Sequence, residues 1–374
     1  MNFEEHAAKP LLADKGIPVP EGAIASTAAA AGEIAHGLGA VVVKAQVPAG
    51  KRGKAGGIKA ADGAEAARRA ATEILAMEIG GHPVERVLVE ARADIARELY
   101  GAVLTDTAAG CPLVMFSTKG GMDIEEVAAS DPDAIRRQLV DIALGFDETA
   151  AEALVRGLDL GDAEGQVAAT LAALYRLYRE RDAEMVEINP LVITGEGQVV
   201  ALDCKFVLDD SAVARQADLA DLGTAEPATV LEARGGEVGL KYIELDGDVG
   251  VLANGAGLTM TTMDAIVHYG GRPANFLEIG GEAYTKAVPA LELVLANPRV
   301  KSLVVNFCGA FARCDVMTEG VVRAWETLTP ALPVFFSIHG TGEVEAQAMV
   351  RERLGLEPFD LMDDAIKAAI GAAR

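Results

Sequence analysis

Basic residues are in short supply in this chain. Lys and Arg make up 33 of its 374 residues, against 56 Asp and Glu, which gives a formal net charge of −23 at pH 7. Such an acidic surface repels phosphate backbones and anionic lipids, so the composition argues against nucleic acid or a membrane as a main partner. An anionic ligand would need a local cluster of cations, and such a cluster should stand out in the sequence.

Cysteines, aromatic residues and long apolar runs are also scarce. The four cysteines show no C-x-x-C spacing, and the chain starts with M-N-F-E-E-H, which is too acidic for a secretory leader. They are therefore expected to be reduced thiols of a cytoplasmic protein. No apolar run approaches the length of a membrane span. The remaining composition, 51% hydrophobic with 40 glycines, suits α/β packing in two or three domains.

The expected cation cluster lies near residue 50. Residues 40–47 (A-V-V-V-K-A-Q-V) predict a buried strand that carries Lys44, and a buried ammonium group needs an anionic partner. The Gly-rich segment at 48–57 follows, where backbone amides and cations suit phosphates. It is not a P-loop, because Lys54 precedes Ala rather than Ser or Thr, and a solvated, flexible loop is the alternative interpretation. The cations of this cluster are Lys44, Lys51, Arg52, Lys54 and Lys59.

A predicted β-hairpin at residues 184–205 gathers a second set of polar groups. Its turn is G-E-G-Q at 195–198. Symmetric closure of this loop places Pro190 across from Asp203, so Asn189 and Asp203 lie together at the open end; turn length fixes this register only to within one residue. An amide and a carboxylate at strand ends offer the oxygen ligands that Mg²⁺ takes. An ordinary hairpin with polar ends is the alternative.

Other segments of the first half carry helix signals and two notable carboxylates. Asn2 is expected to cap a helix over residues 3–15, and the period of residues 134–144 predicts another helix. Glu90 ends a predicted strand, and Glu98 precedes the next one. Both could accept hydrogen bonds from an adenine amino group and ribose hydroxyls, although a solvated surface glutamate is the simpler interpretation of each.

The second half shows regular β-α alternation. This pattern predicts a doubly wound parallel sheet, whose ligands bind at the carboxyl ends of the strands. The turn- and charge-rich segment 216–237 precedes it, so the domain junction is expected near residues 235–236. The expected domains are therefore residues 1–235 and 236–374.

Two features of the second domain leave alternatives open. G-A-G-L-T-M at 255–260 approaches a dinucleotide-binding fingerprint, with Glu278 about twenty positions on, but it lacks the third glycine. NAD binding is thus an alternative. His339 lies in a Gly-flanked turn at a predicted strand end, where it is either a phosphorylatable imidazole or a variant loop side chain.

Six segments, in order along nearly the whole chain, are distinctive. They are M-N-F-E-E-H-A-A-K-P-L-L, V-V-K-A-Q-V-P-A-G-K-R-G-K-A-G-G, V-E-A-R-A-D-I-A-R-E-L-Y, E-I-N-P-L-V-I-T, N-G-A-G-L-T-M-x-T-M-D and G-x-P-A-N-F-L. Together they resemble the β subunit of ADP-forming succinate–CoA ligase and the related malate–CoA ligase. The resemblance implies an ATP-grasp fold followed by a flavodoxin-like CoA-ligase domain. It also implies an α subunit that binds CoA and carries a phosphorylated histidine, in an αβ or α2β2 assembly.

The resemblance also implies roles for particular residues. The nucleotide set, expected to contact ATP, is Lys44, Lys51, Arg52, Gly53, Glu90 and Glu98. The metal pair, expected to bind Mg²⁺, is Asn189 and Asp203. The acid set, expected to bind the carboxylic acid, is Asn254, Ala310, Phe311 and Ala312. Glu187 lies beside the expected transfer site, and its position suggests a catalytic role in orienting the phosphohistidine.

The implied chemistry is phosphoryl transfer, in which positioning and electrostatics dominate. Acid, ATP and CoA would give acyl-CoA, ADP and phosphate through phosphohistidine and an acyl phosphate. Two other functions stay open: an ATP-grasp ligase of another type that acts without an α subunit, and a regulatory subunit whose acid site has decayed.

Departures from the family pattern gather at the acid side. The usual G-G-I-x-R-C-D is G-A-F-A-R-C-D at 309–315, which puts Phe311 in the substrate loop, and R-L-E-G-T-N is S-I-H-G-T-G at 337–342, which loses an arginine. Lys51 and Lys119 replace a usual glycine and glutamate. The acid is therefore open among succinate, malate and related acids, as is the choice of ATP over GTP.

Overall fold

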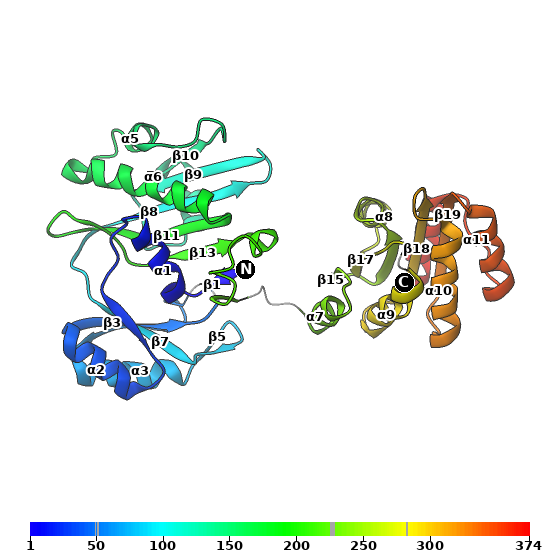
Figure 1. Cartoon of the computed structure of the whole chain (residues 1–374), viewed down its shortest axis with the longest axis horizontal. Helices are drawn as coiled ribbons and strands as arrows, with labels where there is room; N and C mark the ends of the chain where they lie inside the picture. The colour runs from blue at the N-terminus through cyan, green and yellow to red at the C-terminus, as the bar shows by residue number, and fades with distance from the viewer. Residues whose placement is uncertain (49, 51, 225–228, 282) are drawn as a thin grey trace. The chain divides into compact units, whose positions relative to one another are not determined.

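The chain folds into two compact units, Met1–Glu226 and Pro227–Arg374. The structure, a computed structural model, describes residues 1–48, 50, 52–224, 229–281 and 283–374. Figure 1 shows the helices and strands of each unit, and each unit has hydrophobic cores of its own. The expected junction near residues 235–236 lies inside helix α7 (Val230–Glu237) of the second unit, because a capping box formed by Thr229 and Glu232 starts that helix earlier.

The first unit is built on two antiparallel sheets. The larger sheet has the strand order β10-β9-β8-β11-β13-β1-β14, with β12 paired to β11, and the smaller has the order β2-β7-β3-β4; β5 and β6 form a separate pair. The strands are β1 (Asn2–Phe3), β2 (Gly22–Ala25), β3 (Ala40–Gln46), β4 (Ile58–Asp62), β5 (Glu78–Ile79), β6 (His82–Pro83), β7 (Arg86–Ala91), β8 (Ile95–Asp106), β9 (Cys111–Ser117), β10 (Ile135–Leu139), β11 (Ala183–Thr194), β12 (Val199–Ala201), β13 (Lys205–Leu208) and β14 (Gly223–Thr224).

Helices cover these sheets through apolar faces. Helix α6 buries Val167, Leu171, Leu174 and Tyr178, a spacing of one helical face, against the larger sheet. Helices α2 and α3 pack together on the smaller sheet (Figure 1). The α-helices of this unit are α1 (Glu5–Asp14), α2 (Ala28–Leu38), α3 (Ala64–Leu75), α4 (Ile124–Ser130), α5 (Glu148–Val155) and α6 (Glu164–Glu180).

The helix predicted over residues 3–15 is present as α1, but its predicted cap and a second helix prediction in the first unit are wrong. Asn2 does not cap a helix, because its backbone pairs with Val207 of β13 and Thr224 of β14, and α1 starts only at Glu5. Residues 134–144 do not form a helix either, because Ile135–Leu139 is strand β10 and pairs with β9. Apolar residues four positions apart fit a helix as well as an edge strand, so pairing with β9 decides the outcome.

The predicted hairpin is present, with a register that differs by one residue. Strand β11 pairs with β12 through Leu191 and Ala201, and the hydrogen bond from Thr194 N to Gln198 O (2.9 Å) closes a shorter loop than expected. The same register continues at the pair Glu187 and Lys205. It therefore aligns Asn189, rather than Pro190, with Asp203. The Asn189–Pro190 peptide bond is cis.

The second unit is the expected doubly wound sheet. Its strand order is β15-β17-β16-β18-β19, with β15 antiparallel and the other strands parallel. Helices α8 and α12 pack on one face, and α9, α10 and α11 on the other. The chain reverses its direction of winding at β16, so the carboxyl ends of β16 and β18 form the topological switch point where ligands bind in such sheets.

The elements of the second unit match the predicted alternation closely. The strands are β15 (Tyr242–Glu244), β16 (Val249–Asn254), β17 (Asn275–Ile279), β18 (Ser302–Gly309) and β19 (Val334–Gly340). The α-helices are α7 (Val230–Glu237), α8 (Ala256–His268), α9 (Ala283–Ala296), α10 (Cys314–Leu328), α11 (Glu343–Met349) and α12 (Met362–Ala373). In the described part of the chain, every helix is too short or too polar to span a lipid bilayer.

Candidate functional site

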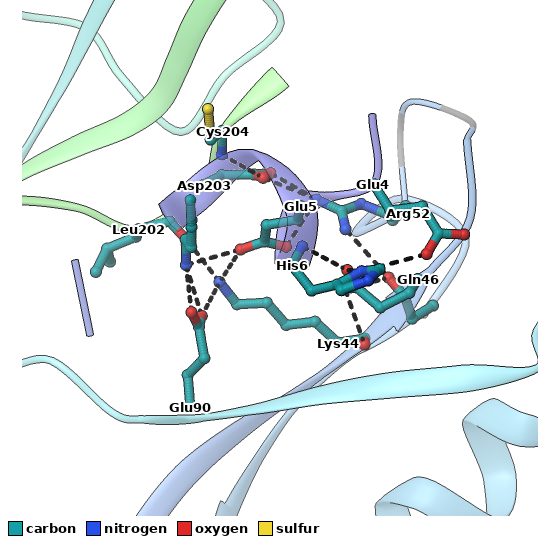
Figure 2. A network of polar contacts seen from close by, with 12 residues as sticks. Glu4, Glu5, His6, Lys44, Gln46, Arg52, Glu90, Leu202, Asp203 and Cys204 are labelled. Carbon is teal, nitrogen blue, oxygen red and sulfur yellow. Dashed lines mark hydrogen bonds and ion pairs between the residues drawn. The ribbon is translucent and has the colours of Figure 1, made fainter. Parts of the chain in front are cut away.

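A buried cluster of three cations and three carboxylates ties the start of the first unit to its later strands (Figure 2). Glu5 and Lys9 lie one turn apart on α1 and share a face. Lys44 on β3 and Glu90 on β7 are diagonal neighbours in the smaller sheet, since Glu90 pairs with Val42. We call the following residues the buried ion cluster: Glu5, Lys9, Lys44, Arg52, Glu90 and Asp203.

The anionic partners of Lys44 are carboxylates of the protein itself. Its Nζ lies 2.8 Å from Glu5 Oε1 and 2.8 Å from Glu90 Oε2, and it donates to Leu202 O at 2.5 Å (Figure 2). Two of its three N–H groups therefore make hydrogen bonds, to Glu5 and Leu202, and Glu90 adds an ion pair. The Lys44 ammonium, predicted to meet phosphate, is thus surrounded by oxygens of the protein in this arrangement.

The electrostatics of the cluster keep Glu5 and Lys44 charged. Burial alone would raise the pKa of Glu5, but the charges of Lys44, Lys9 and Arg52 outweigh it and hold that pKa far below its usual range. Burial would likewise lower the pKa of Lys44, yet Glu5, Glu90 and Asp203 raise it well above its usual value. The cluster is therefore a self-neutralised set of ion pairs near neutral pH.

Arg52 and Asp203 form the open end of the cluster. Arg52 Nη2 donates to Asp203 Oδ1 at 2.8 Å and Oδ2 at 3.0 Å, and it lies 2.9 Å from Glu5 Oε2. Arg52 Nη1 donates to Ala45 O at 3.1 Å, and Cys204 N donates to Asp203 Oδ1 at 2.8 Å. The Asp203 side chain is 30% exposed, whereas that of Glu5 is 0% exposed. A ligand would therefore reach the cluster through Asp203.

Asn189 of the metal pair is held by a neighbouring loop. Its Oδ1 accepts from Gly121 N at 2.8 Å, and its Nδ2 donates to Met122 O at 2.8 Å. Among the described residues, no three His, Cys, Asp or Glu side chains are grouped to hold a metal. Asn189 and Asp203 supply one amide oxygen and one carboxylate, a donor set that fits Mg²⁺, which takes few protein oxygens and keeps water and phosphate ligands.

Glu98 lies beside the same loop and outside the buried ion cluster. Its backbone oxygen accepts from Gly120 N at 3.2 Å, and a Cβ at Gly121 would lie 2.2 Å from Glu98 Oε2. The exposed Glu98 carboxylate and the Asn189 amide therefore both contact the loop that follows β9. The S-T-K-G-G sequence of that loop was the signal for this contact, which sequence reasoning missed.

Glu187 occupies a half-buried position on β11. Tyr100 OH donates to its Oε2 at 3.1 Å, and Lys205 pairs across from it on β13. Burial raises the pKa of Glu187, and the hydrogen bond from Tyr100 and the charge of Lys205 offset this only in part. Burial and the neighbouring Glu187 charge also raise the pKa of Tyr100, so the phenol stays protonated and donates.

The structure thus brings together part of the nucleotide set. Lys44, Arg52 and Glu90 meet in the buried ion cluster with Asp203, while Gly53 is exposed in the loop after β3. Lys51 lies outside the described residues. Glu5 and Lys9 were missed by sequence reasoning, although two charged residues four positions apart on the buried face of α1 were a readable signal.

The acid set lies at the switch point of the second unit. Asn254 Nδ2 donates to Cys308 O at 3.0 Å, and its Oδ1 accepts from Cys308 N at 2.7 Å, so its side chain bridges the ends of β16 and β18. The loop of Ala310, Phe311 and Ala312 follows β18; the Phe311 ring is entirely exposed, whereas Ala312 is partly buried against the core of the unit.

His339 stands next to this loop on the neighbouring strand. It pairs with Cys308 in the parallel register of β18 and β19, and its Nδ1 lies 4.0 Å from Glu343 Oε2. Its backbone oxygen accepts from Cys314 Sγ at 3.0 Å. The side chain is 42% exposed, so it is available to a ligand at the carboxyl edge of the sheet.

Comparisons with known proteins agree with this organisation. Residues 2–193 match the model of the ATP-grasp domain family, and residues 252–360 match that of the CoA-ligase family. A succinate–CoA ligase [GDP-forming] subunit beta from Thermus thermophilus is 43% identical over 99% of this chain and 97% of that protein. An ADP-forming counterpart from Natronomonas pharaonis is 42% identical over 99% of this chain and 98% of that protein.

A solved structure shares the fold of the chain. The structure of ATP citrate lyase from Methanothrix soehngenii in complex with citrate and coenzyme A matches with a TM-score of 0.70 at 23% identity, over 99% of each chain. The sequence relatives cover both units, in the order found here. The chain therefore belongs to the family of succinate–CoA ligase β subunits and is a ligase with an ATP-grasp domain followed by a CoA-ligase domain.

Proposed function

We propose that the chain is the β subunit of an ADP-forming acid–CoA ligase, which couples ATP hydrolysis to acyl-CoA formation or runs in reverse. The observation that carries this proposal is the meeting of Arg52 with Asp203, in register with Asn189, within an ATP-grasp domain of a full-length relative of succinate–CoA ligases. In this proposal Arg52 would be a phosphate-binding cation beside the oxygen ligands of a magnesium–nucleotide complex.

The first unit would bind ATP and Mg²⁺. Asn189 and Asp203 would hold the metal, which supplies charge neutralisation between the β and γ phosphates. Arg52 and the backbone of the loop around Gly53 would contact phosphate oxygens, and Glu98 would contact the nucleoside. Lys44 and Glu90, which pair with each other, would also contact the nucleotide and would help to fix the positions of Arg52 and Asp203.

Glu187 would serve the transfer of the phosphoryl group. Its carboxylate is oriented by Tyr100 OH at 3.1 Å and lies across from Lys205. In this role it would accept a hydrogen bond from the imidazole of a phosphohistidine and hold the ring in line with the phosphate. The histidine would belong to a partner α subunit, which would also bind most of CoA.

The acid would bind at the switch point of the second unit. Asn254 and the backbone N–H groups of Ala310, Phe311 and Ala312 offer donors to a carboxylate. The proposed acid is succinate, malate or a related acid, and Phe311 with His339 would select among them. The four cysteines, all described and all free, support a reducing cytoplasmic location.

The test is co-expression of the chain with the reading frame that neighbours its gene, followed by a screen of carboxylic acids for CoA-dependent release of ADP. At least one acid should give release, and Asp203→Ala should abolish it. Native mass measurement separates an αβ from an α2β2 assembly. Release of ADP by this chain alone would support an ATP-grasp ligase of another type. If no acid gives CoA-dependent release of ADP, the ligase proposal is overturned.

A further inference from the structure

Arg52 contacts the same carboxylate that the metal pair offers to Mg²⁺. Its Nη2 lies 2.8 Å from Asp203 Oδ1 and 3.0 Å from Asp203 Oδ2, so one guanidinium nitrogen faces both oxygens (Figure 2). Oδ1 has a second donor in Cys204 N at 2.8 Å. Oδ1 thus has two donors and Oδ2 has one, so a metal ion on Asp203 would have to share this carboxylate with the Arg52 guanidinium.

Because the buried ion cluster is balanced in charge, Arg52 and a divalent cation would compete for Asp203. Its three cations and three carboxylates neutralise one another while Arg52 faces Asp203. A divalent cation added beside the guanidinium would meet strong repulsion in a site where the Arg52 side chain is only 10% exposed. Metal binding therefore requires that Arg52 turns away from Asp203.

Arg52 is the member of the cluster that can turn toward a nucleotide. Lys44 is fixed on β3, where its ammonium group contacts Glu5, Glu90 and Leu202 O. Lys9 is likewise anchored on α1, between Glu90 and Leu202 O. Arg52 instead lies in the loop between β3 and β4, next to the exposed Gly53. Its guanidinium suits phosphate as well as carboxylate, so a nucleotide phosphate offers it an equivalent partner.

We propose that Arg52 couples nucleotide binding to metal binding by exchanging Asp203 for a phosphate, which frees Asp203 for Mg²⁺. This inference rests on the proposed function of the metal pair. The exchange makes the site selective for the metal–nucleotide complex. Free divalent cations are rejected by the Arg52–Asp203 ion pair, and the first nucleotide phosphate to arrive removes that barrier.

The test measures Mn²⁺, as a paramagnetic substitute for Mg²⁺, by its free electron paramagnetic resonance signal, with and without ADP. The full-length wild type should bind Mn²⁺ weakly alone and much more tightly with ADP. Arg52→Gln should bind Mn²⁺ without ADP about tenfold more tightly than the wild type, since the competing charge is gone. ADP should then add little to its Mn²⁺ affinity.

Matched variants separate this effect from a general change in charge. Lys54→Gln removes one cation from the same loop, where Lys54 pairs with Glu126 at 3.1 Å and not with Asp203, and it should leave ADP-free Mn²⁺ affinity unchanged. The double variant Arg52→Gln with Asp203→Asn should not show the higher ADP-free Mn²⁺ affinity expected for Arg52→Gln alone. Arg52→Lys, which keeps the charge near the cluster, should show a smaller gain and serves if Arg52→Gln does not fold.

The outcomes distinguish this inference from the proposed metal pair. If Asp203→Asn in the wild-type background leaves Mn²⁺ binding with ADP unchanged, the metal pair itself is wrong. If Asp203→Asn weakens that binding but neither Arg52 variant tightens ADP-free Mn²⁺ binding, the metal pair stands and the coupling by Arg52 is overturned.

Discussion

Glu5 provides the clearest test of the buried ion cluster at the residue scale. Its side chain is 0% exposed and pairs with Lys9, Lys44 and Arg52. Glu5→Gln keeps the shape but leaves these buried cations short of one counter-charge, which costs about 3–5 kcal/mol of unfolding free energy. Urea unfolding at pH 7 measures this loss. Glu73→Gln, which removes an exposed partner of Lys59, should change stability little.

The wild type and Glu5→Gln should also differ in how their stability changes with acid. Burial alone would raise the pKa of Glu5, but its three cations lower it from the usual 4.5. A group whose pKa is lower in the folded state stabilises the fold above its unfolded pKa and loses this contribution as the pH falls toward the folded value. The stability gap between wild type and Glu5→Gln should therefore be full at pH 7 and narrow below about pH 4.5. A constant gap from pH 7 to pH 3 contradicts this assignment.

The hydroxyl group of Tyr100 is expected to lower the pKa of Glu187. The Tyr100 hydroxyl donates to the carboxylate and so favours its charged form, which lowers a pKa that burial raises. Tyr100→Phe removes this donor, and the pKa of Glu187 should rise further. In the assembled ligase, the acidic limb of the pH–rate profile should move to higher pH. A limb that stays in place would show that Glu187 is not the group that titrates.

Single residues also show the limit of what the sequence could predict. The apolar strand around Lys44 predicted that this lysine needs an anionic partner, and the structure contains one. Its identity was not readable, because Glu5 and Glu90 come from segments 39 and 46 positions away in the chain and meet Lys44 only through the packing of α1 and the pairing of β3 with β7.

The loop after β9 contacts two residues of the proposed nucleotide and metal sites, Glu98 and Asn189. Gly121 has a φ of +68°, a Cβ there would lie 2.2 Å from Glu98 Oε2, and its N–H donates to Asn189 Oδ1. Gly121→Ala should raise the KM for ATP severalfold in the assembled ligase, because the added methyl group displaces the Glu98 carboxylate. Gly110→Ala is the matched control, since it has a φ of +66° and nothing within 4 Å of its Cβ. Equal effects of the two substitutions would reduce the role of Gly121 to backbone strain.

Elements with a strong apolar period were predicted well. Elements whose structure depends on pairing with a neighbouring strand were not. The strand around Lys44 and the helices of the second unit follow their periods. Strand β10, by contrast, exposes Arg136 and Arg137 at the sheet edge, so its sequence I-R-R-Q-L carries little strand signal without β9. The hairpin register also depended on one residue of turn length, which sequence alone does not determine.

At the scale of the whole molecule, the resemblance of six ordered segments correctly predicted both folds. Regular β-α alternation alone predicted the doubly wound sheet of the second unit, and the order of its parallel strands agrees. The two-sheet architecture of the first unit came only from the family resemblance, because long-range antiparallel pairings such as β1 with β13 leave no local pattern in the sequence.

The division into two units should hold when the chain is cut. Units Met1–Glu226 and Pro227–Arg374 have separate cores, and each is large enough to bury a stable core of its own. Each fragment should therefore unfold cooperatively in calorimetry, and only the first should bind ADP with Mg²⁺, because the buried ion cluster and the metal pair lie within it. A fragment that ends at residue 160 is the control: it lacks α6, whose apolar face covers the larger sheet, and it should not fold. Loss of cooperative unfolding in either full unit, or nucleotide binding by the second, would contradict this division of labour.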